Sequence, residues 1–197
     1  MDGHTTEVTD LANSNVSCDT FGELETARIS SVGGVLENTP IVCGGIDSLI
    51  RQSCLIFGQS QSVTMTEPRY GAASIVLNTT TMWVVGGWDG SNFLSSSEFI
   101  TLENAVAGPS LPYKMYLHCA VKFNESQIYV IGGIYGDRND YVYIFNPLDN
   151  FSYKQGPSMN YRRRYHGCAV MHDGETSVIV SVGGYGRLSS QAASSNA

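Results

Sequence analysis

Short apolar runs that each end in a pair of glycines recur four times along the chain. They lie at residues 40–45, 82–87, 128–133 and 180–184, and the first glycines of successive pairs are 42, 46 and 51 residues apart. Runs of this length, bounded by glycine, are typical of short β-strands rather than helices. A repeat of about 40–50 residues has room for four such strands and their turns. The pattern therefore predicts an all-β chain built from repeats.

Two further landmarks stay in register with the glycine pairs. A short strand pattern precedes each of the last three pairs, at residues 71–76, 118–121 and 166–170. A Gly-Pro dipeptide, at 108–109 and again at 156–157, closes the second and third units, and it lies 11 residues before Cys119 and 12 before Cys168. Because separate landmarks keep matched spacing, the repeat is not an accident of a glycine-rich composition.

These units resemble the kelch repeat. The second unit, with Gly86-Gly87-Trp88-Asp89-Gly90 followed by Ser97-Glu98, is a close match, and the third is similar through Asn146-Pro147. The resemblance covers residues 27–186 and implies a partial kelch-type β-propeller with about four blade repeats, the last truncated. Residues 1–26 and 187–197 are then expected to be a flexible N-terminal segment and a flexible C-terminal tail. The tryptophan that the family places on the fourth strand is missing; Val63, Val106 and Tyr153 stand near its place.

Four glycine pairs are fewer than the roughly six blades with which kelch propellers close. The sequence is therefore interpreted as a fragment, a truncated product or a degenerate propeller. An open arc exposes strand edges, so self-association through open blade edges is expected.

Charge and hydropathy restrict the partners. The 197 residues carry a net charge of -7 with only 11 lysines and arginines, which argues against a nucleic-acid ligand. No stretch approaches the roughly 20 apolar residues of a membrane-spanning helix, so no membrane insertion is expected. The first residues, Met1 to Thr5, do not have the pattern of a signal peptide.

Five cysteines give an odd number. Cys43 and Cys54 flank one predicted turn and form a candidate cross-strand disulfide, the alternative being two buried thiols. Cys119 and Cys168 are interpreted as equivalent positions of successive repeats, too far apart for a bond, which predicts a packing role. Four glycosylation sequons, at Asn15, Asn78, Asn124 and Asn150, together with the first cysteine pair favour an extracellular over a cytoplasmic location, although the missing signal peptide argues the other way.

Catalytic chemistry is not predicted. His118 and His166 each lie near a cysteine, which is compatible with metal ligation, but their recurrence at matching repeat positions favours a structural role. Neither a phosphate-binding loop nor a nucleophile motif is found, so no catalytic residue, metal or cofactor is expected. The alternatives are a fragment related to the copper radical oxidases, which also use kelch-like propellers, and a nonfunctional truncated kelch product.

The expected function is protein binding through the loops between strands, with an unknown protein partner. The kelch resemblance places variable residues after each glycine pair and an arginine before each inner strand. The candidate partner-binding residues are Trp88, Asp89, Asn92, Phe93, Tyr135, Asp137, Arg138, Arg162, Arg163 and Arg164. An arginine cluster suits a partner with carboxylates, and tyrosines 161 and 165 beside it would add contact area.

Overall fold

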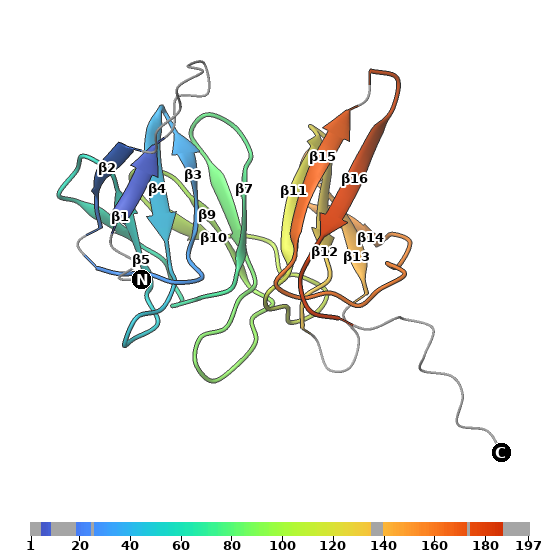
Figure 1. The fold of residues 1–197 in the computed structure, drawn as a ribbon, viewed down its shortest axis with the longest axis horizontal. Helices are drawn as coiled ribbons and strands as arrows, with labels where there is room; N and C mark the ends of the chain where they lie inside the picture. Colours follow the sequence, from blue (N-terminus) through green and yellow to red (C-terminus); the bar gives the residue numbers. More distant parts are fainter. Residues whose placement is uncertain (1–4, 9–18, 25, 135–139, 173, 187–197) are drawn as a thin grey trace.

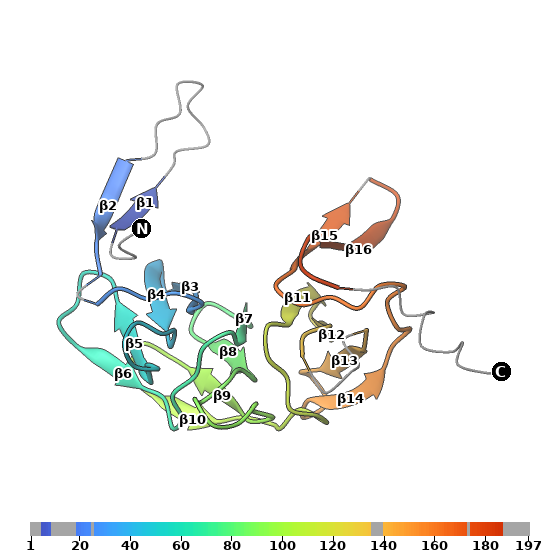
Figure 2. The same ribbon diagram turned by 60° about the horizontal axis from the view of Figure 1, so that its bottom comes forward.

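The computed structural model describes residues 5–8, 19–24, 26–134, 140–172 and 174–186. In this part of the chain all regular structure is β, and it forms three four-stranded antiparallel sheets and two two-stranded ones. We call the four-stranded sheets blades 1, 2 and 3. Figures 1 and 2 show them arranged side by side along an arc, with the two-stranded sheets at its two ends.

Each blade runs through four strands in chain order, with the first strand innermost on the arc. Blade 1 contains β3 (Val32–Leu36), β4 (Thr39–Cys43), β5 (Ser53–Ile56) and β6 (Ser62–Thr64). Blade 2 contains β7 (Ala73–Val76), β8 (Met82–Val85), β9 (Ser97–Ile100) and β10 (Ala105–Ala107). Blade 3 contains β11 (Cys119–Asn124), β12 (Gln127–Ile131), β13 (Val142–Asn146) and β14 (Ser152–Gln155).

Up to residue 186, where the described residues end, the fourth repeat has two strands, β15 (Gly167–His172) and β16 (Ser177–Val182), which we call the half-blade. This agrees with the predicted truncation of the last repeat. At the other end, β1 (Thr5–Val8) pairs with β2 (Asp19–Glu23) inside the segment 1–26 that was expected to be flexible. The expectation missed this hairpin because the glycine-pair landmark marks only the inner strands of a repeat. The predicted tail, 187–197, lies outside the described residues.

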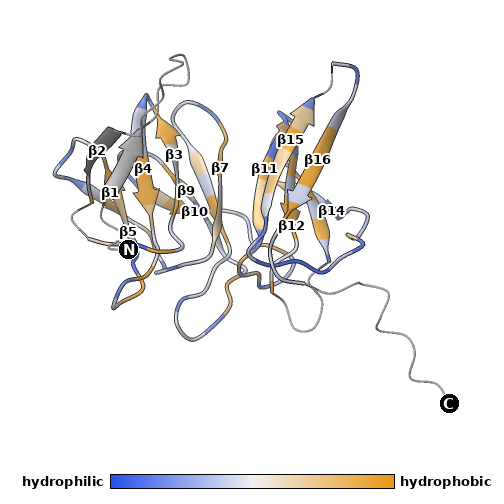
Figure 3. Ribbon diagram, in the orientation of Figure 1, coloured by the Kyte–Doolittle hydropathy of each residue, from blue (hydrophilic) through white to orange (hydrophobic). Residues whose placement is uncertain are grey.

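Two apolar cores lie between the blades. One joins blades 1 and 2, and the other joins blades 2 and 3. Strand β8 contributes to both: Met82 and Val84 point into the first core, and Trp83 and Val85 into the second. The strand is therefore buried on both faces, because successive side chains of a β-strand point to opposite sides. Figure 3 shows the apolar colour concentrated on the strands, the half-blade included.

The glycine pairs allow neighbouring blades to approach closely. The first glycine of each pair has a positive φ, 65° at Gly86 and 66° at Gly132. A Cβ at either position would lie 2.7 Å from a carbonyl oxygen of the next blade's entry segment, that of Met115 or Arg163. Glycine is thus required both for the backbone conformation and for the contact.

Two series of backbone hydrogen bonds join the blades. The second glycine of each of the first three pairs donates to the entry segment of the next repeat: Gly45 to Arg69 (2.9 Å), Gly87 to Met115 (2.8 Å) and Gly133 to Arg163 (2.8 Å). Two residues after each acceptor, a second series follows: Gly71 donates to Ser30 (2.9 Å), Leu117 to Gly71 (2.8 Å) and Tyr165 to Leu117 (3.1 Å). The same backbone geometry therefore repeats from blade to blade.

Candidate interaction surface on the loop face

The loop from β8 to β9 is held in shape by its own side chains and backbone. The Asp89 carboxylate accepts hydrogen bonds from the N–H groups of Ser91 and Asn92, each at 2.6 Å. These bonds favour the ionised form and hold the pKa of Asp89 below its usual range. Trp88 exchanges two backbone hydrogen bonds with Tyr70 of the entry segment into blade 2. Asp89, a predicted contact residue, thus has a clear role in shaping the loop.

Four aromatic rings gather where this loop meets the entry segment of blade 3. Phe93 stacks on Tyr116 with ring centroids 5.6 Å apart and an interplanar angle of 15°. Trp88 packs against Tyr116 at 6.0 Å and against Tyr70 at 5.5 Å. Tyr116 is buried, and burial raises the pKa of its hydroxyl. Aromatic pairs at these separations stabilise one another, so the cluster is a rigid platform.

An open hollow of about 480 Å³ lies over this aromatic cluster. It is lined by the sequence-predicted residues Trp88, Asn92 and Phe93, and by Tyr116 and Lys114. Asn92 and Lys114 are exposed, while Trp88 and Phe93 are half-buried. The hollow therefore combines apolar walls with an amide and a cation at its rim.

The sequence analysis did not identify Tyr70, Tyr116 and Lys114. The two tyrosines hold the same place in the structure, since each lies one residue after the backbone acceptor of an inter-blade bond, at Arg69 and Met115. The residue that follows a glycine pair forms a bridge with this entry position, as Trp88 does with Tyr70. Lys114 carried no sequence signal, because only the packing of blade 2 against blade 3 brings it to the hollow.

The three neighbouring arginines divide between different roles. Arg163 donates from Nη1 to the carbonyl of Gly183 at 2.6 Å, and its guanidinium lies over the ring of Tyr161 at 5.6 Å. Arg164 pairs through its backbone with Tyr185 and has an exposed side chain. Arg162 is half-buried. Arg164 is thus the member of the predicted cluster that is most available to a partner.

The role of Arg163 recurs in two other repeats. Arg28 donates from Nη1 to the carbonyl of Gly44 (2.9 Å), and Arg69 to that of Gly86 (2.8 Å). Each of these carbonyls belongs to the first glycine of a pair, as Gly183 does. The arginine before an inner strand therefore binds its own repeat's glycine turn, and Arg163 is a structural residue of this kind.

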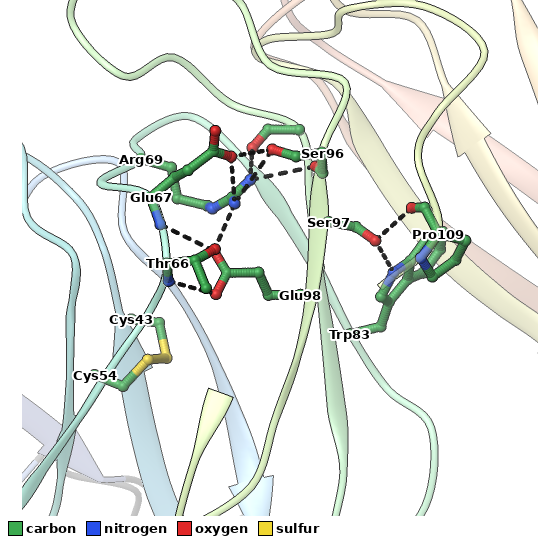
Figure 4. A network of polar contacts seen from close by, with 11 residues as sticks. Cys43, Cys54, Thr66, Glu67, Arg69, Trp83, Ser96, Ser97, Glu98 and Pro109 are labelled. Atoms are coloured by element: carbon green, nitrogen blue, oxygen red, sulfur yellow. Dashed lines mark hydrogen bonds and ion pairs between the residues drawn. A yellow bond between two sulfur atoms is a disulfide. The ribbon is translucent and has the colours of Figure 1, made fainter. Parts of the chain in front are cut away.

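Blade 2 adds a carboxylate to this arrangement. Figure 4 shows Arg69 between Glu98 of β9 and Glu67 of the entry segment, with Arg69 Nη2 2.7 Å from Glu98 Oε1 and 3.3 Å from Glu67 Oε2. The side chains of Arg69 and Glu98 are 0% and 1% exposed. Glu98 Oε2 also accepts from the N–H of Thr66 at 2.7 Å. The pair is fully buried and hydrogen-bonded, which indicates a structural network.

His118 and His166 are both buried at the start of an inner strand. Burial is the main cause that lowers the pKa of each imidazole to about 4. The neighbouring His166 lowers the pKa of His118 further, and Arg163 lowers that of His166. The Cε1 atoms of the two rings face the first glycines of pairs, Gly86 and Gly132. No group of three His, Cys, Asp or Glu side chains with a metal-site arrangement occurs among the described residues.

The four cysteines that the structure describes form two disulfides, Cys43–Cys54 and Cys119–Cys168. The first joins directly opposite residues of β4 and β5. The second corrects the prediction that Cys119 and Cys168 are too far apart to bond: their Cα atoms are 6.1 Å apart. Strand pairing shows that the equivalent of Cys119 is Gly167, because these residues oppose Ile131 and Val182, the last residues before a glycine pair. The one-residue offset turns the two side chains to opposite faces of their sheets, so they meet between the blades.

The remaining predicted positions fall into two groups. Tyr135, Asp137 and Arg138 lie outside the described residues. Asn78, Asn124 and Asn150, three of the four sequon asparagines, lie at exposed positions. In the described part of the chain there is no helix with the length and hydropathy needed to cross a membrane.

Comparison with known proteins identifies the architecture. No family model matches the sequence, and no curated protein is detectably similar to it. Among 154 chains of solved structures that match, the structure of YjhT superposes with a TM-score of 0.76 at 11% sequence identity. The fold is a partial β-propeller. The match covers 86% of this chain and 64% of YjhT, so the chain spans less than two thirds of that propeller-like protein. At this identity the similarity concerns the fold alone.

Proposed function

We propose that this partial propeller is a protein-interaction module of the kelch-repeat type, which binds a protein partner through the loops at one end of its blades. The kelch assignment is supported by the recurrence of the glycine pair, of the arginine before the inner strand and of the backbone bonds that join the blades. Loops carried on a rigid sheet scaffold are common binding elements.

The observation that carries this proposal is the hollow over the aromatic cluster. Trp88 and Phe93 present half-buried rings that are already ordered by Tyr70 and Tyr116, so little conformational entropy is lost when a partner binds. Aromatic residues at the centre of a patch with polar groups at its rim are typical of interaction hot spots. Lys114 adds a positive charge at the rim, which favours a partner that places a carboxylate beside an apolar side chain.

The test compares an exposed lysine at the rim of the hollow, Lys114, with an exposed lysine away from it, Lys154. Lys114→Glu reverses the charge at the hollow, and Lys154→Glu makes the same change on β14. A partner isolated from the native source with the unmodified chain is titrated against each variant. We expect Lys114→Glu to weaken its binding by a factor of about 10 or more, and Lys154→Glu to leave it nearly unchanged. Equal effects of the two changes would place the binding surface elsewhere.

A second variant tests the apolar part of the hollow. Phe93→Ser removes one ring while the Asp89 hydrogen bonds that shape the loop remain. Truncating a hot-spot aromatic weakens binding by at least about 2 kcal/mol, or about 30-fold. Full binding by Phe93→Ser, with its melting temperature unchanged, would contradict an aromatic contact.

A further inference from the structure

The half-blade lacks the covering that its equivalents have in complete blades. Val182 precedes a glycine pair, as Val85 and Ile131 do, and pairs with the first inner strand in the same way. Val85 is 0% and Ile131 3% exposed, but Val182 is 64% exposed. Met171 and Val178 of the half-blade are also more than half exposed. In blades 2 and 3 a third strand lies beside the equivalent of β16, and in the described part of the chain β16 has no strand on that side.

The N-terminal hairpin β1–β2 has the register of the two outer strands of a blade. Strand β2 ends at Glu23, five residues before Arg28, and β6 ends at Thr64, five residues before Arg69. Arg28 and Arg69 hold equivalent places, since each binds the carbonyl of its own repeat's glycine turn. By this register β2 holds the place of a fourth strand and β1 that of a third strand, in a blade that precedes blade 1. Such a blade also requires a first and a second strand, and β15 and β16 are the first and second strands of a blade.

The backbone hydrogen bonds between blades also indicate that the two ends of the arc match. Each second glycine donates to the carbonyl of the residue that opens the next blade, as Gly87 does to Met115. Gly184 stands at the end of this donor series, and Arg28 stands in the place of the acceptors, at the opposite end of the arc. In the second series, Tyr165 and Ser30 hold the corresponding end positions. The two ends of the arc therefore present matching halves of one repeated interface.

We propose that the half-blade β15–β16 of one copy is completed by the hairpin β1–β2 of a second copy, so that copies join head to tail. The second copy supplies the third and fourth strands, and its blade 1 packs on the half-blade as blade 2 packs on blade 1. Figure 2 shows β1–β2 and β15–β16 at opposite ends of the arc, so a single copy in this conformation does not pair them. An association of two β16 edges would leave Gly184 without the Arg28 carbonyl. This inference does not depend on the loop-face function proposed above.

The pairing register specifies a crosslink. Blade 1 is the blade whose fourth strand has the same spacing to its arginine as β2. There the residue before the glycine pair, Cys43, opposes Cys54, which pairs with Val63, six residues before Arg69. The residue of β1 that pairs with the position six residues before Arg28, Gly22, is Thr6. By this register Val182 of one copy opposes Thr6 of the other. In blade 1 the corresponding pair is Cys43 and Cys54, which form a disulfide, so the pairing is compatible with such a bond.

The experiment mixes two chains of residues 1–197 in a Cys18→Ser background, one with Val182→Cys and the other with Thr6→Cys. We expect a reducible covalent dimer of one chain of each kind. The matched control replaces Val182→Cys with Ser177→Cys, at the far end of β16. It should crosslink to Thr6→Cys at least about 10-fold less, because five residues of strand span roughly 17 Å. Equal crosslinking of the two pairs, a preferred Val182→Cys homodimer, or a monomeric intrachain link in a chain carrying both Thr6→Cys and Val182→Cys would overturn the proposal.

A second measurement needs no engineered bond. The mass of the unmodified chain, followed by light scattering as concentration rises, should increase beyond that of one copy. Val182→Asp should hold it at one copy, while Val106→Asp, at a valine 51% exposed on the outer strand of blade 2, should still associate. Because Val182 is exposed in the single copy, Val182→Asp is expected to fold. An unmodified chain that stays at the mass of one copy at its highest soluble concentration contradicts the proposal.

Discussion

Blade 2 and the half-blade β15–β16 share one sequence pattern but have different surroundings. Both contain an arginine before the first strand, Arg69 or Arg163, and an apolar run that ends in a glycine pair. The first strand begins at Ala73 in blade 2 and at Gly167 in the half-blade. Blade 2 is covered by a neighbour on each face, and strand β8 is buried on both sides. The half-blade packs on blade 3 through β15 and is largely exposed beyond it. The repeat pattern thus determines strand pairing, whereas burial depends on neighbouring blades.

Replacing the arginine before the first strand should give the largest difference in the free energy of unfolding between blade 2 and the half-blade. Arg69→Ala leaves Glu98 buried without its cation, which should lower the free energy of unfolding by about 3–5 kcal/mol. Arg163→Ala removes a single bond to a carbonyl at a half-buried position and should cost less than about 1.5 kcal/mol. Urea denaturation followed by far-ultraviolet circular dichroism, which reports on the strands of both regions, measures both changes. Similar losses would show that the half-blade is covered in solution.

The disulfide Cys119–Cys168 should decide how firmly the half-blade is held. Replacing both cysteines by serine opens a loop of 49 residues, for which chain entropy gives about 4 kcal/mol. We expect amide exchange to accelerate in β15 and β16 while β8 keeps its protection. The control replaces Cys43 and Cys54, which are 11 residues apart, at about 3 kcal/mol. If this control also accelerates exchange in the half-blade, the two regions unfold as one unit and the comparison fails.

Two valines at equivalent positions test burial directly. Val85→Ala removes a fully buried side chain from the core between blades 2 and 3 and should cost about 2 kcal/mol. Val182→Ala, at 64% exposure, should change the free energy of unfolding by less than about 0.5 kcal/mol. Chemical denaturation at a concentration where the chain is a single copy gives both values. A larger loss at Val182 under associating conditions would agree with the completed blade.

The smallest expected effect concerns two histidines, His118 between blades 2 and 3 and His166 between blade 3 and the half-blade. Their pKa values of about 4 in the folded chain lie below the value of about 6.5 in an unfolded chain. Between these values the unfolded state binds protons that the folded state does not, so stability falls as the pH drops below about 6.5. Each histidine should account for about 1 kcal/mol at pH 5.5. Unfolding curves at pH 7.5 and 5.5 should show a smaller difference for His118→Gln and for His166→Gln; an unchanged difference for either one contradicts its buried neutral state.

Much of the fold could be predicted from the sequence because the repeat is local. Gly86 and Gly132 mark strand ends whose φ and close contacts only glycine allows, and their spacing correctly predicted sheets built from repeats. The candidate site was predicted less completely. The loop containing Trp88 and Phe93 was identified, but Tyr70, Tyr116 and Lys114 come from entry segments that only blade packing brings beside it. Arg163, one of the predicted contact residues, also binds its own repeat's glycine turn, which its position before the inner strand did not distinguish from that of its neighbours.

Apart from the hairpin β1–β2, the sequence by itself determined the strands of the repeats, their order within each blade and the positions of the glycine turns, because these depend on backbone conformation and on side chains close in the chain. Only the tertiary structure decided which cysteines meet and which apolar residues are covered. Cys119 and Cys168 bond because a one-residue difference in strand register turns their side chains toward each other across the blade interface. Val85 and Val182 have the same place in the repeat, and their burial differs because burial is a property of the neighbouring sheet.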